Sequence, residues 1–141
     1  MPLGYFDSSA LVKLLIAEAG SELAGDLWNS CDVAVSSRLA YPEVRAALAA
    51  AGRANRLSSA DQHRAEALWE RFWAATRPVE LTPAVMSHAG DLAARHALRG
   101  ADAVHLASLL ALESDQTVFV VWDERLRAGA QAVGARLAPA G

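Results

Sequence analysis

The sequence predicts a single α/β domain over residues 1–141, with a short central parallel β-sheet flanked by helices. Short apolar runs alternate along the chain with stretches of helical pattern, and this alternation is typical of parallel sheets that are covered on both faces. The clearest strand, residues 117–122, is β-branched and aromatic. No linker, internal repeat or low-complexity tract interrupts the pattern, so we expect one folding unit.

Local signals place the individual elements. Ser8, Ser58 and Thr82 are residue types that favour helix N-caps, and each precedes a helical pattern. Pro42 indicates either the first turn of its helix or a kink within it, and Gly52 is the expected stop of that helix. We predict strands over residues 3–6, 32–36, 79–81, 117–122 and 135–137, and helices over residues 10–17, 21–29, 38–51, 58–75, 82–98, 101–110 and 124–133.

The composition is that of a globular protein and excludes several functional classes. Hydrophobic residues make up 53% of the 141 residues, enough for a substantial core. The single cysteine, Cys31, excludes an internal disulfide and a multi-cysteine zinc site, and there is no glycine-rich phosphate loop. No apolar run is long enough to span a membrane and the start does not resemble a signal peptide, so we expect a cytoplasmic protein with no membrane partner. The net charge of −3 argues against general adhesion to nucleic acid, except at a site where metal ions supply positive charge.

Four carboxylates occupy positions where an ordinary surface charge is not expected. Asp7 and Asp123 each follow an apolar strand, at the strand end where open parallel sheets form their sites. Glu43 shares its helix face with alanines and leucines, and Asp102 interrupts a helix that is apolar nearly all the way round. Taken one at a time, helix capping explains Asp7 and Asp123, and the helix dipole explains Asp102.

If the four side chains converge, they predict a chemistry. Two carboxylates about 4 Å apart repel by roughly 4 kcal/mol at an effective dielectric near 20, so a cluster must protonate or bind cations. A set of oxygen ligands suits a hard ion such as Mg²⁺ or Mn²⁺. Two such ions stabilise the attacking and leaving oxygens of a phosphodiester displacement. The set therefore predicts metal-dependent hydrolysis of a phosphate ester.

The segments that carry these acids resemble the PIN-domain ribonucleases, and most closely the VapC toxins of bacterial toxin–antitoxin pairs. The matching segments are residues 7–13, 41–45, 98–107 and 118–126. The resemblance implies a PIN-like domain and a metal-dependent endoribonuclease. Its catalytic acids, and ligands of Mg²⁺ or Mn²⁺, would be Asp7, Glu43, Asp102 and Asp123, with Asp7 and Asp102 as the principal ligands.

The same resemblance implies partners for the protein, and the chain departs from the family pattern at one position. It implies an RNA substrate, a cognate VapB-like antitoxin and a homodimer, and an arginine of the antitoxin often reaches the acidic pocket in this family. Ser8 or Ser9 would support the turn at Asp7. The family usually carries Thr or Ser two residues before the last aspartate, where this chain has Val121.

Other residue types admit a structural and a functional interpretation. His105 lies one turn after Asp102, and we expect a core histidine, with a metal ligand or proton carrier as the alternative. Trp69 and Trp73 are expected to pack in the core, with a partner surface as the alternative. Arginines near the acids would hold RNA phosphates or pair at the surface; they are Arg38, Arg45, Arg95, Arg99, Arg125 and Arg127.

Two other functions compete with the nuclease. Because Val121 lacks a hydroxyl, a catalytically weak PIN-like domain that binds RNA or protein is the main alternative. An aspartate after the first strand also occurs in phosphatases and receiver domains. The phosphatase pattern needs a second aspartate where Ser9 stands, and the chain lacks the acidic pair and lysine of a receiver.

Overall fold

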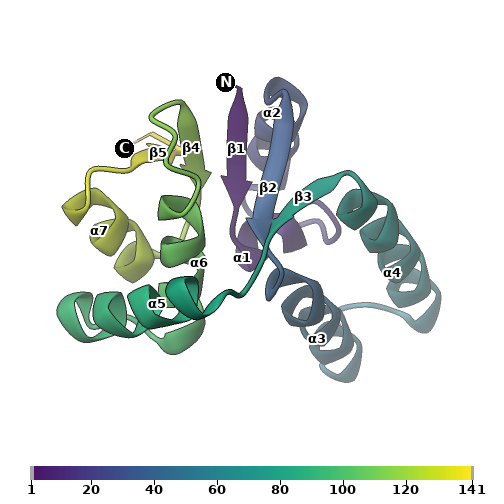
Figure 1. Ribbon diagram of the computed structural model, residues 1–141. Helices are drawn as coiled ribbons and strands as arrows, with labels where there is room; N and C mark the ends of the chain where they lie inside the picture. The colour runs from purple at the N-terminus through teal and green to yellow at the C-terminus, as the bar shows by residue number, and fades with distance from the viewer. Residues whose placement is uncertain (1, 141) are drawn as a thin grey trace.

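A five-stranded sheet forms the centre of the computed structural model, which describes residues 2–140 (Figure 1). The strands are β1 (Leu3–Phe6), β2 (Val33–Ser37), β3 (Thr76–Val79), β4 (Thr117–Val120) and β5 (Arg136–Ala138). Their order is β3-β2-β1-β4-β5 and every pairing is parallel. Strand β1 is therefore central, and Leu3 is in register with Val33 on one side and Thr117 on the other.

Helices cover both faces of this sheet. Helices α5 (Pro83–His96), α6 (Gly100–Leu110) and α7 (Glu124–Ala132) pack on one face. Helices α1 (Ser8–Val12), α2 (Ser21–Ser30), α3 (Ala40–Arg53) and α4 (Ser59–Ala74) pack on the other. The two groups stand on opposite sides of the sheet in Figure 1. This arrangement confirms the predicted fold class.

Alternation along the strands explains why two layers of helices are needed. Tyr5 belongs to the core under α5, α6 and α7, whereas its neighbour Phe6 belongs to the core under α1, α3 and α4. Phe119 and Val120 divide between the two cores in the same way. All four side chains are fully buried. Since successive side chains point to opposite faces, a strand that is apolar throughout must be covered on both.

Three local predictions were wrong or incomplete. The helix predicted over residues 10–17 is the short α1, which ends at Val12, and residues 13–16 continue as turns whose apolar side chains pack on the core. The strand predicted over residues 79–81 lies earlier, as β3. It contains Pro78, which is tolerated because β3 is an edge strand. Gly52 does not end its helix, since α3 continues to Arg53.

The alternative left open at Pro42 is resolved. Pro42 is the third residue of α3, whose N-cap is Leu39. The first backbone N–H groups of a helix have no partner within the helix, so proline is tolerated there without a kink. Within residues 2–140, no helix is both long enough and apolar enough to cross a membrane.

Candidate active site

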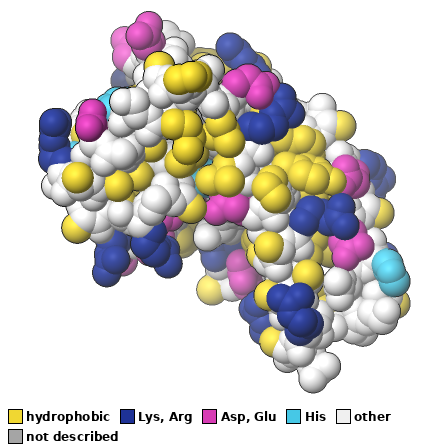
Figure 2. Space-filling model, turned by 60° about the horizontal axis from the view of Figure 1, so that its bottom comes forward, with side chains coloured by type: hydrophobic (Ala, Val, Ile, Leu, Met, Phe, Trp, Pro, Cys, Tyr) yellow, Lys and Arg dark blue, Asp and Glu magenta, His cyan; other side chains and the backbone are white. Residues whose placement is uncertain are grey.

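The four predicted acids all lie at the carboxyl edge of the sheet or in the helices that start there. Asp7 follows β1 and is the N-cap of α1, and Asp123 follows β4 and is the N-cap of α7. Glu43 lies in the first turn of α3 and Asp102 in the first turn of α6. Figure 2, in which the bottom of Figure 1 comes forward, shows acidic side chains in a hollow between the α5–α7 side and the α3 side. The sheet topology therefore collects residues that are far apart in the sequence.

Asp7 is the most deeply buried of these acids. Its side chain accepts a hydrogen bond from the backbone N–H of Ala10 at 2.9 Å, and only 4% of the residue is exposed. Burial raises the pKa of Asp7 from 3.8 to about 6, and the nearby carboxylates of Asp102 and Glu43 also raise it, although His105 and the Ala10 N–H oppose the shift. Asp7, Asp102 and Glu43 are thus electrostatic neighbours.

Glu43 is fixed by a buried hydrogen-bond network. Its Oε1 lies 2.7 Å from Nε2 of His105 and accepts the Ser8 hydroxyl at 2.5 Å. The Tyr5 hydroxyl lies 2.9 Å from the other ring nitrogen of His105. A carboxylate only accepts, so Nε2 of His105 carries the hydrogen, and in the neutral ring Nδ1 accepts from Tyr5. Burial alone would raise the pKa of Glu43, but the interactions with His105 and Ser8 lower it below its ordinary value.

Arg99 connects the remaining two acids. Its Nε donates to Oδ2 of Asp102 at 2.9 Å, and Asp102 is half-buried while Arg99 is exposed. The hydrogen bond to Asp102 and the charges of Asp102 and Asp123 raise the pKa of the Arg99 guanidinium. Asp123 uses its Oδ2 to accept the N–H of Leu126 at 3.1 Å. Arg99 therefore places a positive charge near both carboxylates.

These donors match a divalent cation in their chemistry. Carboxylate oxygens are the preferred ligands of hard cations, and a cation beside Asp7 would favour the ionised form that burial disfavours. Part of the donor set is engaged within the protein, since Glu43 bonds His105 and Asp102 bonds Arg99. Within residues 2–140, no three His, Cys, Asp or Glu side chains form a group that could hold one ion in this arrangement. In donor chemistry the acids suit a divalent cation, and two of them, Glu43 and Asp102, are engaged by His105 and Arg99.

The hydrogen bond between His105 and the candidate acid Glu43 is not apparent from the sequence. His105 is a buried, hydrogen-bonded histidine, as predicted, but its partner is the candidate acid Glu43. Ser8 donates to Glu43, whereas the turn at Asp7 is supported by the Ala10 N–H. Spacing is the sequence signal that points to His105: it lies three residues after Asp102, and residues three apart share one helix face, so His105 is expected on the side of the acids.

Several of the other sequence candidates have structural partners. Arg38 binds Glu80, and Arg45 contacts Tyr41 and Glu70. Trp69 is fully buried, which confirms its place in the core. Among the arginines near the acids, Arg99 is the one whose side chain bonds a candidate site residue.

Burial of Asp7 predicts a stability effect that depends on pH. The folded-state pKa of about 6 exceeds the ordinary 3.8, so ionised Asp7 destabilises the fold fully above pH 6 and not at all below about pH 4. One pKa unit is about 1.4 kcal/mol. Asp7→Asn should therefore raise the free energy of unfolding of the metal-free protein by up to about 3 kcal/mol near pH 8 and by only about 1 kcal/mol near pH 4.5. Urea denaturation in EDTA measures this, with the exposed Asp91→Asn as control, and equal effects at both pH values would contradict it.

The buried network predicts a coupled loss of stability. Tyr5→Phe and His105→Leu each remove one partner from a buried hydrogen bond, so each should cost about 1–3 kcal/mol. In the double variant the loss should be smaller than the sum by roughly 1 kcal/mol, because the same contact is removed only once. Urea denaturation of the three variants closes the cycle. Simple additivity would show that the two groups do not depend on each other.

Residues 4–131 match the profile of the PIN-domain family. The chain is 64% identical to Ribonuclease VapC49 of Mycobacterium tuberculosis (strain ATCC 25618 / H37Rv) over 140 residues, which are 99% of this chain and 97% of that one. Its fold is similar to the crystal structure of M. tuberculosis VapC20, described as a sarcin–ricin loop cleaving toxin, with a TM-score of 0.67, 20% identity and coverage of 89% and 93%. It is also similar to a chain of a toxin–antitoxin complex from Klebsiella pneumoniae, with a TM-score of 0.63, 15% identity and coverage of 89% and 91%. The chain therefore belongs to the PIN-domain family, and within it to the VapC ribonucleases.

Proposed function

We propose that this ribonuclease is the toxin of a VapBC pair and that it hydrolyses RNA phosphodiester bonds with Mg²⁺ or Mn²⁺ held chiefly by Asp7 and Asp102. Its membership among the VapC ribonucleases supports the reaction class. The observation that carries the proposed site is Asp7, a buried carboxylate with two further carboxylates close enough to raise its pKa. A cation beside such a group favours the ionised form that burial disfavours.

The protein groups have separate tasks in this proposal. A bound divalent ion supplies an activated water molecule and stabilises negative charge on the reacting phosphate. Asp7 and Asp102 bind it, and Asp123 completes the acidic set at the end of β4. Glu43 is held in place by His105 and Ser8, so its carboxylate is oriented before substrate arrives. Arg99 is exposed and lies beside Asp102, where it can contact an RNA phosphate.

A cognate VapB-like antitoxin is the proposed protein partner, and a homodimer the proposed assembly. The similarity to a chain of a toxin–antitoxin complex supports the antitoxin. An open hollow of about 430 Å³ between the turns after α1 and helix α2 offers an apolar lining that includes Leu14, Trp28 and Phe72. Leu81, just before α5, and Met86, in its first turns, are exposed hydrophobic residues, and such side chains favour contact with a second chain.

The proposed metal ligands predict a loss of activity with a retained fold. Asp7→Asn and Asp102→Asn should each reduce divalent-dependent cleavage of structured RNA on the order of a hundredfold or more, because a neutral amide binds a hard cation weakly. Cleavage is followed by gel electrophoresis with Mg²⁺ or Mn²⁺ and with EDTA, and circular dichroism checks the fold. Asp91→Asn, an exposed change on α5, should cleave like the wild type. Survival of cleavage in both site variants would refute the proposal.

A substitution at Val121 tests the alternative that the protein is a catalytically weak binding module. Its side chain is fully buried and belongs to the core under α5, α6 and α7. Val121→Thr should leave the turnover number unchanged and lower the free energy of unfolding by about 1–2 kcal/mol, because a hydroxyl is added to an apolar core. Single-turnover cleavage and urea denaturation measure the two quantities. A large gain in turnover would instead favour a site weakened by the missing hydroxyl.

A further inference from the structure

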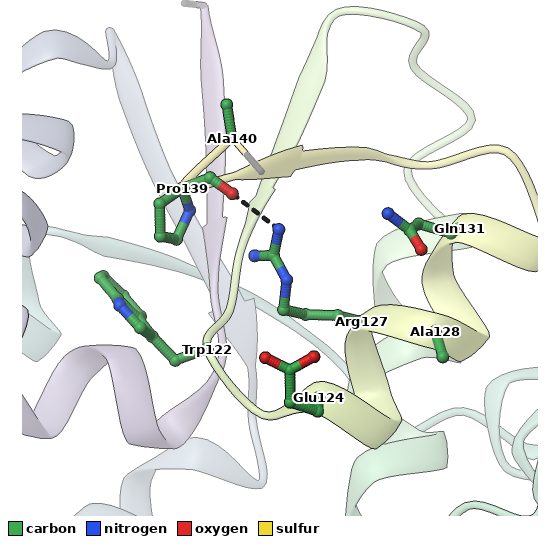
Figure 3. A pocket seen from close by; sticks show the side chains of 7 residues that line it. All are labelled: Trp122, Glu124, Arg127, Ala128, Gln131, Pro139 and Ala140. Carbon is green, nitrogen blue, oxygen red and sulfur yellow. Dashed lines mark hydrogen bonds between the residues drawn. The ribbon is translucent and has the colours of Figure 1, made fainter.

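A hollow of about 400 Å³ lies beside the candidate site and contains none of its four acids (Figure 3). Its size is within the range of small-ligand pockets. The indole of Trp122 and the ring of Pro139 lie on one side, and Glu124, Arg127 and Gln131 of α7 lie across from them. This hollow, called the Trp122 pocket below, has no role in the proposed cleavage.

The Trp122 pocket adjoins the acidic site through a shared residue. A second hollow is lined by Arg99, Asp123, Glu124 and Arg125, so Glu124 belongs to both. Trp122 also directly precedes Asp123 in the chain. A nucleic-acid strand whose phosphate lies at the acids therefore has a neighbouring nucleotide within reach of the Trp122 pocket.

The indole of Trp122 is held in place by residues that do not line the pocket. Nζ of Lys13 lies 5.0 Å from the ring centroid, and Lys13 is itself fixed by donating to the carbonyl of Ala19 at 2.8 Å. Gly20 has a φ of 90°, and a Cβ atom built there would come within 3.1 Å of the ring. Backbone and lysine thus support the indole closely. A rigid aromatic wall loses little conformational freedom when a flat ligand stacks on it.

Arg127 is also fixed before a ligand arrives. Its Nη1 donates to the carbonyl of Val121 and its Nη2 to the carbonyl of Pro139, both at 2.7 Å. A guanidinium has five N–H donors, so these bonds leave further donors for a ligand. Glu124 is exposed, and Figure 3 shows its carboxylate beside Arg127 on the wall of the pocket. The pocket therefore combines a stacking surface, an acceptor and oriented donors.

This combination selects a flat, uncharged ligand with donors and acceptors on its edge. Glu124 would repel a phosphate, and Arg127 would repel a cationic side chain of a protein partner. RNA-binding proteins read unpaired bases by stacking them on aromatic side chains and bonding their edges. Guanine presents two adjacent N–H donors that suit a carboxylate, next to O6, which suits arginine or an amide.

We propose that the Trp122 pocket binds an unpaired guanine of the RNA substrate. The base stacks on Trp122, its N1–H and N2–H groups donate to Glu124, and its O6 accepts from Arg127 or Gln131. This inference rests on the proposed function, because it places the base next to the phosphate that is cleaved. It makes Trp122 and Glu124 residues that determine which RNA is bound.

Binding of short RNA analogues tests the pocket without cleavage. Fluorescein-labelled 2′-O-methyl hexamers, one of uridine only and others with a single guanine, adenine or cytosine, are titrated into the full chain in EDTA and followed by anisotropy. The guanine hexamer should bind about tenfold more tightly than the others, because only guanine satisfies both Glu124 and Arg127 or Gln131 with its edge. Trp122→Ala should weaken binding of the guanine hexamer by about tenfold, since stacking on an aromatic side chain contributes an effect of this order. Glu124→Gln should reduce the preference for guanine while leaving the uridine hexamer unaffected.

The same titrations include a control variant and give the results that would contradict guanine binding in the pocket. Glu113→Gln makes the same chemical change on the exposed segment before β4, at the opposite edge of the sheet, and should keep the preference. Glu124 is exposed, so its variant stays informative even if Trp122→Ala unfolds. Equal binding of all hexamers, no binding of any, or a preference that survives Glu124→Gln overturns the pocket. The proposal is also overturned if Trp122→Ala weakens the binding of a VapB-type peptide but does not affect the binding of any RNA hexamer. None of these results alters metal-dependent cleavage, which the Asp7→Asn comparison tests separately.

Discussion

The site depends on the burial of one carboxylate directly after the central strand of the sheet. Asp7 caps α1 through the Ala10 N–H, so it cannot turn away from the sheet without leaving that helix start uncapped. Burial, together with the nearby carboxylates of Asp102 and Glu43, raises its pKa to about 6, which makes the metal-free arrangement unfavourable near neutral pH. The fold thus carries an unfavourable interaction at the place where a cation would relieve it, and stability elsewhere must offset it.

The network around His105 shows how the fold holds such a site together. Tyr5 belongs to β1, Glu43 to α3 and His105 to α6, so two hydrogen bonds link the central strand with helices on opposite faces of the sheet. These hydrogen bonds hold the Glu43 carboxylate in one orientation, so that it does not turn toward solvent or toward Arg99. Asp102 differs, because its partner Arg99 is exposed and an ion pair with an exposed member is weakly held. The site therefore has a fixed half and an adaptable half.

Much of the molecule was predictable because its signals are local. The N-caps at Ser58 and Thr82 and the apolar strand before Asp123 predicted elements that the structure contains. The failures have physical causes. Pro78 and Arg77 gave β3 no strand signal, and β3 exists because the edge of the sheet accepts a residue without an N–H group. Residues 13–16 form turns, and from these turns Leu14, Leu15 and Ile16 pack on the core, a tertiary contact that the helical pattern of the sequence does not reveal.

By itself, the sequence determined the fold class, the four unusual carboxylates and their link to strand ends, since hydrophobic periodicity and the position of an acid after a strand are properties of the chain alone. Only the tertiary structure decided which groups meet. It placed His105 and Ser8 on Glu43, Arg99 on Asp102, and Trp122 with Glu124 and Arg127 around one hollow. These partners come from different strands and helices or depend on rotamers, and no spacing rule connects them. Residue types at strand ends indicated the chemistry, whereas its electrostatics and candidate substrate contacts required the packing of both helical layers on the sheet.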